Sequence, residues 1–315
     1  MKKKFLFAGF SLILLLTSCN GTSHPISDYR KTLTYKEGFK ILQLTDIHNS
    51  NVTDLTASNA YVKEEIEDAD PDLIVITGDT FMDANKTIVN STIDFIDSFN
   101  IPFAFTYGNH DLQGNYDDDY INRTLTSTKN AVFVDYDKDA LYGRTNYFID
   151  LTKDNTTVYR LYILDSNSYW QNSAFIGYDI FHEEQIKHVE DITEAYGKVP
   201  SLAFFHIPLY EFRTAYNLYK EGDTSVVGTG TNEEKCSVGY TETNAFNRMK
   251  ACGIEGMFIG HDHINDTTLL YNNVVLSYGM KSTAEIYHDK IGYTTITLNS
   301  TGFSMTDVKK VITHE

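Results

Sequence analysis

The sequence is poor in cysteine, proline and basic residues, and each shortage excludes a class of protein. The three cysteines include no Cys-x-x-Cys pair, which excludes a cysteine-rich zinc domain. Five prolines, with no proline-rich or low-complexity stretch, exclude a mainly disordered chain. Lys and Arg total 26 against 43 Asp and Glu, so the net charge of −17 argues against nucleic acid as the main partner.

The N-terminal residues have the pattern of a secretion signal. Residues 2–4 are lysines, and the apolar run over 5–16 is shorter than the roughly 20 residues of a membrane-spanning helix. The following Leu-Thr-Ser-Cys resembles the lipobox of bacterial lipoproteins, which implies acylation of Cys19 and a cell-envelope protein anchored to the membrane. Ordinary signal cleavage nearby is the alternative. We expect a signal peptide over 1–18, a polar tether over 19–38 and a single domain over 39–315.

Two cysteines remain if Cys19 is acylated. Outside the cytoplasm, Cys236 and Cys252 form a pair that permits a disulfide. Two free thiols are the alternative, because nothing in their spacing places them within bonding distance.

The folded part of the chain repeats a short apolar strand, a polar turn and a helix. Continuous apolar runs indicate strands buried on both faces over 40–45, 73–77, 101–106, 201–205 and 256–259. Helices are expected over 59–69, 87–98 and 244–251. Segments of alternating polarity indicate antiparallel strands over 146–151, 158–164, 274–278 and 293–298. The order of these segments indicates an α/β protein.

Histidines gather where the expected strands end. Of ten histidines, five lie at or just past carboxyl ends of strands: His48, His110, His206, His261 and His263. They are accompanied by Asp46, Asp79, Asn109 and Asp111. A lone aspartate after a strand usually caps a helix, but open α/β sheets bind ligands at this edge. Five clusters in one topological position therefore predict a functional site.

The donor set indicates a pair of metal ions. Imidazoles, carboxylates and one amide, without thiolates, suit Zn, Mn, Fe or Ni. These donors exceed the demand of one ion, whereas two ions about 3.5–4 Å apart that share a carboxylate would use them. Such a pair orients a phosphate and activates a water molecule.

Five motifs occur in a fixed order: Asp-x-His at 46–48, Gly-Asp at 78–79, Gly-Asn-His-Asp at 108–111, a strand-end His206, and Gly-His-x-His at 260–263. Together they resemble the calcineurin-like metallophosphoesterases over the whole chain after the tether. The resemblance implies a four-layer αββα sandwich, with two mixed sheets face to face, helices outside and metals at the strand ends. It implies hydrolysis of a small phosphate ester by a hydroxide that bridges two divalent or trivalent transition-metal ions.

The resemblance also implies a role for each residue. One ion would be held by Asp46, His48, Asp79 and His263, and the other by Asp79, Asn109, His206 and His261. His110 would not bind metal but would stabilise the phosphoryl charge or protonate the leaving oxygen. Asp111 would orient the His110 imidazole.

Two departures narrow the subfamily. His48 stands where purple acid phosphatases have glycine, and Met82 stands where they have their tyrosine ligand, which argues against an iron–tyrosinate site. The segments 164–167 and 206–209 resemble the purple-acid-phosphatase-like branch that lacks this tyrosine. A nuclease of the same superfamily and an envelope binding protein with a vestigial metal site are the alternatives. No protein partner is inferred.

Other residues near the motifs have two interpretations. Aromatic side chains there either wall a substrate pocket or pack in the core: Tyr107, Tyr169, Trp170 and Tyr210. Arginines either bind a second phosphate or lie on the surface without such a role: Arg144, Arg160 and Arg213. The acidic run 117–119 is expected to be a solvated loop or the start of a helix.

Overall fold

The computed structural model describes residues 24–137, 139–284 and 290–311. The expected signal peptide and Cys19 lie outside these ranges. Within them, no helix has the length and apolar character that a membrane span requires. Cys236 and Cys252 are both described, and both are buried free thiols rather than a disulfide.

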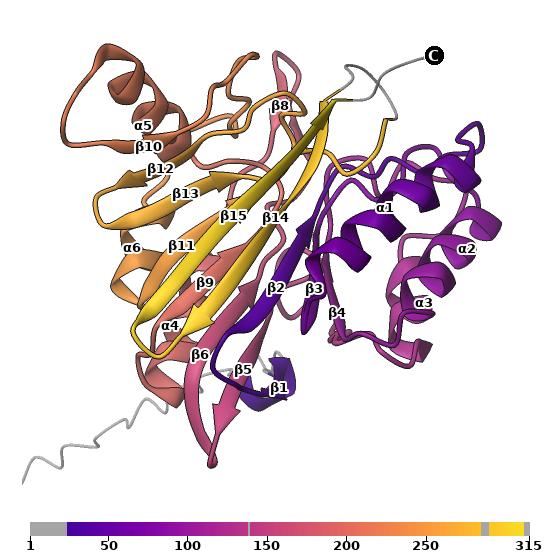
Figure 1. Cartoon of the computed structure of the whole chain (residues 1–315), viewed down its shortest axis with the longest axis horizontal. Helices are drawn as coiled ribbons and strands as arrows, with labels where there is room; N and C mark the ends of the chain where they lie inside the picture. The colour runs from indigo at the N-terminus through magenta and orange to yellow at the C-terminus, as the bar shows by residue number, and fades with distance from the viewer. Residues whose placement is uncertain (1–23, 138, 285–289, 312–315) are drawn as a thin grey trace, which may run out of the picture.

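Two mixed sheets form the centre of the molecule (Figure 1). The larger sheet contains, in spatial order, β1 (Arg30–Thr34), β5 (Tyr147–Lys153), β6 (Thr156–Ile163), β9 (Ser201–Phe204), β11 (Ile254–Ile259), β13 (Val274–Tyr278), β12 (Thr268–Tyr271) and β10 (Val227–Thr229). The smaller contains β15 (Gly302–Val311), β14 (Lys290–Asn299), β2 (Phe39–Leu44), β3 (Leu73–Thr77) and β4 (Phe103–Thr106). A separate hairpin is formed by β7 (Tyr169–Gln171) and β8 (Ile176–Tyr178).

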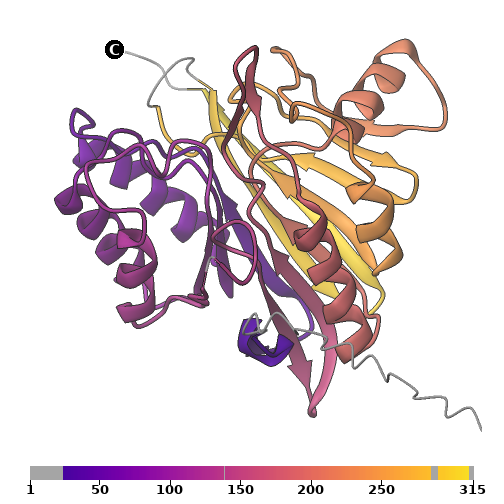
Figure 2. The ribbon, with the colours of Figure 1, turned by 180° about the vertical axis from the view of Figure 1, so that it is seen from behind.

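Helices cover the outer face of each sheet. The smaller sheet is flanked by α1 (Leu55–Ala69), α2 (Lys86–Asp97) and α3 (Tyr120–Ser127) (Figure 1). The larger sheet is flanked by α4 (Glu183–Tyr196), α5 (Tyr210–Glu221) and α6 (Ala245–Ala251), as the reverse view shows (Figure 2). This arrangement confirms the predicted four-layer αββα sandwich.

The core lies between the two sheets, whose central strands, such as β3 and β9, are buried on both faces. Phe258 of β11 packs edge-on against Phe303 of β15, with ring centroids 6.1 Å apart. The Tyr147 hydroxyl of β5 donates to the carbonyl of Phe105 of β4 at 3.2 Å. Aromatic and hydrogen-bonded contacts thus hold the sheets together and place their strand ends side by side.

The segment expected to be a tether belongs in part to the folded domain. After a short 3-10 helix, η1 (Ile26–Tyr29), strand β1 pairs in parallel with β5. Tyr29 and Tyr35 are buried, and the Arg30 guanidinium lies 2.9 Å from the Asp150 carboxylate. The polar composition of β1 suggested a tether because an edge strand exposes much of its surface.

The predicted elements are present with shifted ends. Helix α1 begins at Leu55 rather than near residue 59, because the Asp54 carboxylate accepts the backbone N–H of Thr56 at 2.9 Å and caps the helix. Strand β13, expected to be antiparallel, is antiparallel to β12 but parallel to β11. Helix α3 begins directly after the acidic run 117–119, as one of the two expectations for that run required.

Candidate metal centre

All five motifs follow strands that end at one shared edge of the sheets. β2, β3 and β4 are parallel neighbours in the smaller sheet, and β9 and β11 are parallel neighbours in the larger. Bonds at this edge connect the sheets: the His206 Nδ1 donates to the Thr77 carbonyl at 2.8 Å, and the His261 N–H donates to the Asp46 carboxylate at 3.0 Å. The facing sheets therefore gather residues that are over 200 positions apart in the sequence.

The first group of donors consists of Asp46, His48 and His263. The Nε2 atoms of the two histidines are 3.1 Å apart. The Asp46 Oδ1 lies 3.6 Å from the His48 Nε2 and 3.4 Å from the His263 Nε2. These three buried side chains point their donor atoms at one place, as ligands of a single ion do.

The second group consists of Asp79, His206 and His261. The Asp79 Oδ2 lies 3.1 Å from the His206 Nε2, which lies 3.3 Å from the His261 Nδ1. The same Asp79 oxygen is 3.9 Å from the His48 Nε2 of the first group. Asp79 therefore lies between the groups, where a carboxylate shared by two ions has to be.

Asn109 adds an oxygen donor beside the second group. Its side-chain Oδ1 is buried and accepts no hydrogen bond from any residue that the structure describes. Its amide nitrogen donates to the Tyr169 hydroxyl at 3.1 Å, which fixes the orientation of the amide. A buried carbonyl oxygen without a donor costs free energy, and a bound cation would relieve that cost. The residues therefore fit a metal pair.

Four of the candidate ligands have left-handed backbone conformations, with φ of 51° at Asp46, 55° at His48, 49° at Asp79 and 81° at His261. Each such residue costs on the order of 1–3 kcal/mol and persists only where neighbouring contacts impose it. Here the His48 N–H donates to the Asp79 carbonyl at 3.0 Å. The backbone is thus strained at the points where side chains converge.

Glycines next to the ligands permit a close approach of backbone to carboxylate. A Cβ on Gly108 would lie 2.2 Å from the Asp79 Oδ1, and one on Gly260 would lie 2.6 Å from the Asp46 Oδ2. No side chain fits at either distance. The Gly-Asn-His-Asp and Gly-His-x-His motifs therefore require glycine as their first residue, because there is no room for a Cβ.

The buried charges of the centre depend on one another. Burial would raise the pKa of Asp46, but bonds from His263 and His48 hold it well below its usual range. Burial would lower the pKa of His206, but the facing Asp79 carboxylate raises it to about 10. Because the His206 Nδ1 is bonded to a carbonyl, the second proton lies on Nε2, toward Asp79. A metal cation can replace that proton.

The expected link between Asp111 and His110 is absent from the described contacts. Asp111 accepts the backbone N–H groups of Gly108 at 2.7 Å, Asp79 at 2.9 Å and Phe81 at 2.8 Å. The carboxylate thus joins the loops after β3 and β4 instead of orienting the imidazole. Its two oxygens are occupied by donors that point inward, while His110 is partly exposed.

Gln113 has the position that was assigned to Asp111. Its side-chain Oε1 lies 2.7 Å from the His110 Nδ1, and its N–H donates to the His110 carbonyl at 2.9 Å. The spacing of three residues in a tight turn was a signal for this contact in the sequence.

Two tyrosines near the ligands carried no sequence signal, since they come from distant segments. The Tyr178 ring meets the His261 imidazole edge-on with centroids 4.3 Å apart. The Tyr278 hydroxyl donates to the Asp262 Oδ2 at 2.6 Å, and Asp262 lies between two candidate ligands.

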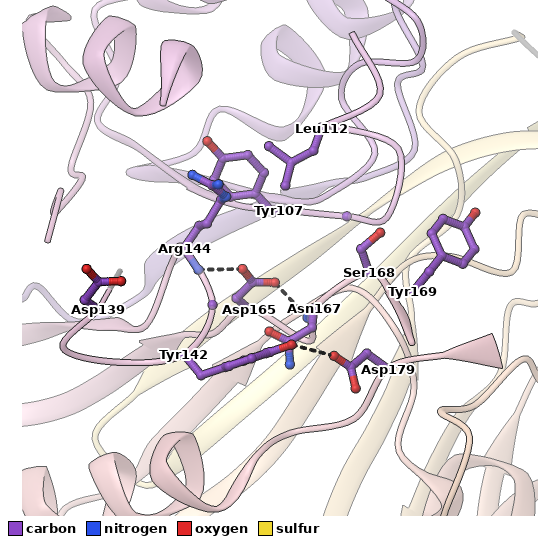
Figure 3. Close-up of a pocket in the computed structure, with 12 residues that line it drawn as sticks. Tyr107, Leu112, Asp139, Tyr142, Arg144, Asp165, Asn167, Ser168, Tyr169 and Asp179 are labelled. Carbon is purple, nitrogen blue, oxygen red and sulfur yellow. Dashed lines mark hydrogen bonds between the residues drawn. The ribbon is translucent and has the colours of Figure 1, made fainter. Parts of the chain in front are cut away.

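The three arginines are occupied elsewhere. Arg160 is buried and its Nε lies 2.7 Å from the Asp150 carboxylate. Arg144 pairs with Asp118 and Asp119, and Arg213 donates to the Cys236 carbonyl. The interpretation of these arginines as a second phosphate site thus gains no support from their contacts. Among the aromatic candidates, Tyr107 and Tyr169 line a cavity of about 330 Å³ next to the centre (Figure 3).

Comparison with known proteins agrees with this geometry. A family model described as calcineurin-like phosphoesterase matches residues 39–265. The chain is 27% identical to a protein named probable inactive purple acid phosphatase 29 from Arabidopsis thaliana, over 87% of this chain and 80% of that protein. It is also 27% identical to a protein named phosphatase DCR2 from Saccharomyces cerevisiae, over 76% of this chain and 47% of that protein.

The chain spans about half the length of the Saccharomyces protein and 55% of an uncharacterised Schizosaccharomyces pombe relative. Among solved structures, a novel phosphatase from Mycoplasma pneumoniae has the same fold, with a TM-score of 0.52, 8% identity, and coverage of 88% of this chain and 95% of that one. The family model covers well over half of the sequence and includes every candidate ligand. The chain belongs to the calcineurin-like phosphoesterase family.

Proposed function

We propose that this protein hydrolyses small phosphate esters with two transition-metal ions bound at the shared edge of its sheets. The observation that carries the proposal is the position of Asp79 between two converging groups of imidazoles and carboxylates. Zinc, manganese and iron suit this donor set. The ions would supply the Lewis acidity that activates a water molecule and draws charge from the phosphate.

The residues divide into two sets of ligands that share Asp79. The first ion would be held by Asp46, His48, Asp79 and His263, and the second by Asp79, Asn109, His206 and His261. The His206 Nδ1–H donates to a carbonyl, so Nε2 would be the ligand atom of His206. The Asn109 amide nitrogen donates to Tyr169, so Oδ1 would be the ligand atom of Asn109.

His110 would serve the leaving group. It lies next to Asn109, and its ring centroid is 5.6 Å from that of His48. Gln113 Oε1 accepts from Nδ1–H, which leaves Nε2 to donate a proton to the ester oxygen as the phosphorus–oxygen bond breaks. Asp111 would act indirectly, because it holds the backbone that carries Asp79 and His110.

Two other functions, a binding protein with a vestigial metal site and a nuclease, require different features of the protein. Some relatives bear names that include the word inactive, and a vestigial site in this chain would make it a binding protein. Retention of the whole donor set, with its strained backbone, favours an enzyme instead. A nuclease would need cations along its groove, and the net charge of −17 disfavours one.

The test is hydrolysis by protein stripped with a chelator and then reloaded with Mn, Fe or Zn. p-Nitrophenyl phosphate, bis-p-nitrophenyl phosphate and a cyclic nucleotide separate monoesterase from diesterase activity. We expect activity that disappears with the metal and returns with it. Equal hydrolysis by stripped protein, or none after reloading with each metal, would reject the proposal.

We also propose that Cys19 is acylated and anchors the domain to a membrane of the cell envelope. The basic residues, the apolar run and the lipobox-like residues support it.

A further inference from the structure

A cavity of about 330 Å³ opens beside the candidate metal centre. Figure 3 shows Tyr107 and Leu112 above the Asp165 carboxylate and Tyr142 below it. Tyr169 lies at another side of the cavity, and its hydroxyl contacts Asn109 of the candidate centre. The volume lies at the lower end of the range for small-molecule sites, so it suits a compact organic group.

The cavity and the metal centre share a wall. Gly108 and Leu112 line the cavity, and they lie on either side of Asn109 and His110 in the sequence. The Tyr169 hydroxyl accepts from the Asn109 amide at 3.1 Å. An ester bound at the metals would therefore have its leaving group beside His110 and at the entrance of this cavity.

The cavity carries excess negative charge. Asp139, Asp165 and Asp179 line it, and among the residues that the structure describes Arg144 is the lining cation. That guanidinium is already paired with two carboxylates outside the cavity, at 3.0 and 2.8 Å. His182 adds a partial charge, because its hydrogen bond to Asp179 raises the pKa of the imidazole. A second phosphate or a carboxylate on the leaving group would be repelled.

The buried carboxylates have few open acceptor sites. Asp165 accepts the backbone N–H groups of Arg144 and Asn167, both at 2.7 Å. Asp179 accepts from the Tyr142 hydroxyl at 3.1 Å and from a backbone N–H at 2.9 Å. These two carboxylates therefore offer a ligand negative charge but few free hydrogen-bond acceptors. A sugar, which binds through its hydroxyl groups, is disfavoured. Tyrosine rings near negative charge are suited to a quaternary ammonium group, which needs no hydrogen bond.

We propose that this cavity binds the leaving group of the substrate and that this group is a small alkylammonium alcohol. The inference rests on the proposed function. Water attacks the phosphorus, the bond from phosphorus to the ester oxygen breaks, and His110 protonates that oxygen. The products are inorganic phosphate and the free amino alcohol, whose positive charge stays between Tyr142 and the carboxylates.

A binding experiment tests the cavity without catalysis. Choline is titrated into full-length, metal-free protein by calorimetry or NMR, and 3,3-dimethylbutan-1-ol serves as the uncharged molecule of the same shape. We expect choline to bind at least threefold more tightly. Equal binding of the two, or binding of neither, would overturn the inference.

Variants locate the binding site. Tyr142→Leu removes the ring, and its matched control Tyr142→Phe keeps the ring without the hydroxyl. We expect choline binding to weaken threefold or more in Tyr142→Leu and to stay near wild type in Tyr142→Phe. Asp139→Asn should also weaken it, whereas Asp154→Asn, in the exposed turn between β5 and β6, should not. Choline binding that is the same in Tyr142→Leu and Asp139→Asn as in wild type would place the ligand elsewhere.

A kinetic comparison separates this inference from the proposed function. Metal-loaded protein should show a higher kcat/KM for choline phosphate than for 3,3-dimethylbutyl phosphate. Hydrolysis of p-nitrophenyl phosphate without this preference would reject the cationic leaving group and leave the phosphatase intact. Selective choline binding without hydrolysis of any ester would reject the phosphatase and leave the cavity assignment intact.

Discussion

His110 lies among the candidate ligands but is held differently from them. Its N–H donates to the Asp79 Oδ1 at 2.8 Å, so its backbone is fixed to the residue that lies between the two donor groups. Its side chain is partly exposed and contacts Gln113 rather than a buried carboxylate. This geometry suits a group that meets substrate, and it separates proton donation from metal binding.

We expect His110→Asn to lower kcat by roughly 10²–10⁴ on alkyl phosphates, the usual range for loss of a positioned acid. The effect should be much smaller on p-nitrophenyl phosphate, because nitrophenolate leaves without a proton. Steady-state kinetics on both esters and the metal content of the variant check this. Loss of metal, or equal losses on both esters, would assign His110 another role.

Tyr278 contacts Asp262, the residue between the candidate ligands His261 and His263. Its buried hydroxyl contacts the Asp262 Oδ2 and, at 2.9 Å, the Cys236 sulfur. We expect Tyr278→Phe to weaken metal binding by roughly 10- to 100-fold, as loss of a group that orients ligands does. Titration with a chelator as competitor measures this affinity. Tyr271→Phe is the control, since this tyrosine of β12 packs on Phe246 of α6, with ring centroids 5.7 Å apart. Equal affinities in both variants would show that Tyr278 does not position the centre.

At the scale of elements, some side chains have a shifted pKa because helix packing buries them, not because they belong to the candidate site. His188 of α4 packs edge-on against Tyr29 of η1, with centroids 4.5 Å apart. Its Nε2 is buried and accepts no bond from the part of the chain that is described. Burial lowers the pKa of His188 to about 4. Between pH 6.5 and pH 4, the folded protein therefore keeps this histidine neutral, whereas the unfolded chain protonates it.

The sign of the pH effect follows from that difference. His188 lowers stability below its unfolded pKa of about 6.5, with a loss of roughly 2 kcal/mol by pH 5 and more toward pH 4. We expect His188→Gln to lose less stability than wild type between pH 8 and pH 5. Urea unfolding of metal-free protein at both pH values measures this. A variant that loses as much stability as wild type would contradict the assignment.

The elements that could be predicted from sequence were those with uninterrupted apolar runs. β3 matches its predicted range of 73–77, because five buried residues in a row follow a proline turn. β1 was missed because it is a polar edge strand. α4 and α5 were missed because their charged residues hide a narrow apolar face, with only Phe212 and Ala215 buried on α5. Local pattern therefore identifies central strands better than the helices that cover them.

The candidate ligands were easier to predict from sequence than the residues that position them. Short motifs at strand ends are brought together by parallel pairing, so Asp46 and Asp79 could be expected to meet. Gln113 is local to His110, three residues on, whereas Tyr178 and Tyr278 act through side-chain packing across distant segments, which no spacing encodes. The contacts of Asp111 could not be predicted either, since its partners are backbone N–H groups.

At the scale of the whole molecule, the proposed anchor would hold the domain at a membrane. We expect Cys19→Ser to move the protein from the membrane fraction to the soluble fraction, because no acyl chains would be attached. Fractionation followed by immunoblotting measures this, with Cys252→Ser as the control. A Cys19→Ser protein that stays in the membrane fraction at wild-type level would contradict acylation at this residue.

The central claim is that one carboxylate, Asp79, joins two metal sites into one catalytic centre. The most direct test is to count metal ions per chain and activity together in wild type, Asp79→Asn and the control Asp70→Asn. Asp70 is exposed and also has a positive φ of 45°, so the control makes the same chemical change in the same backbone conformation. We predict two ions and full activity in wild type and Asp70→Asn, and fewer than two ions with little activity in Asp79→Asn. Two ions and wild-type activity in Asp79→Asn would contradict the account.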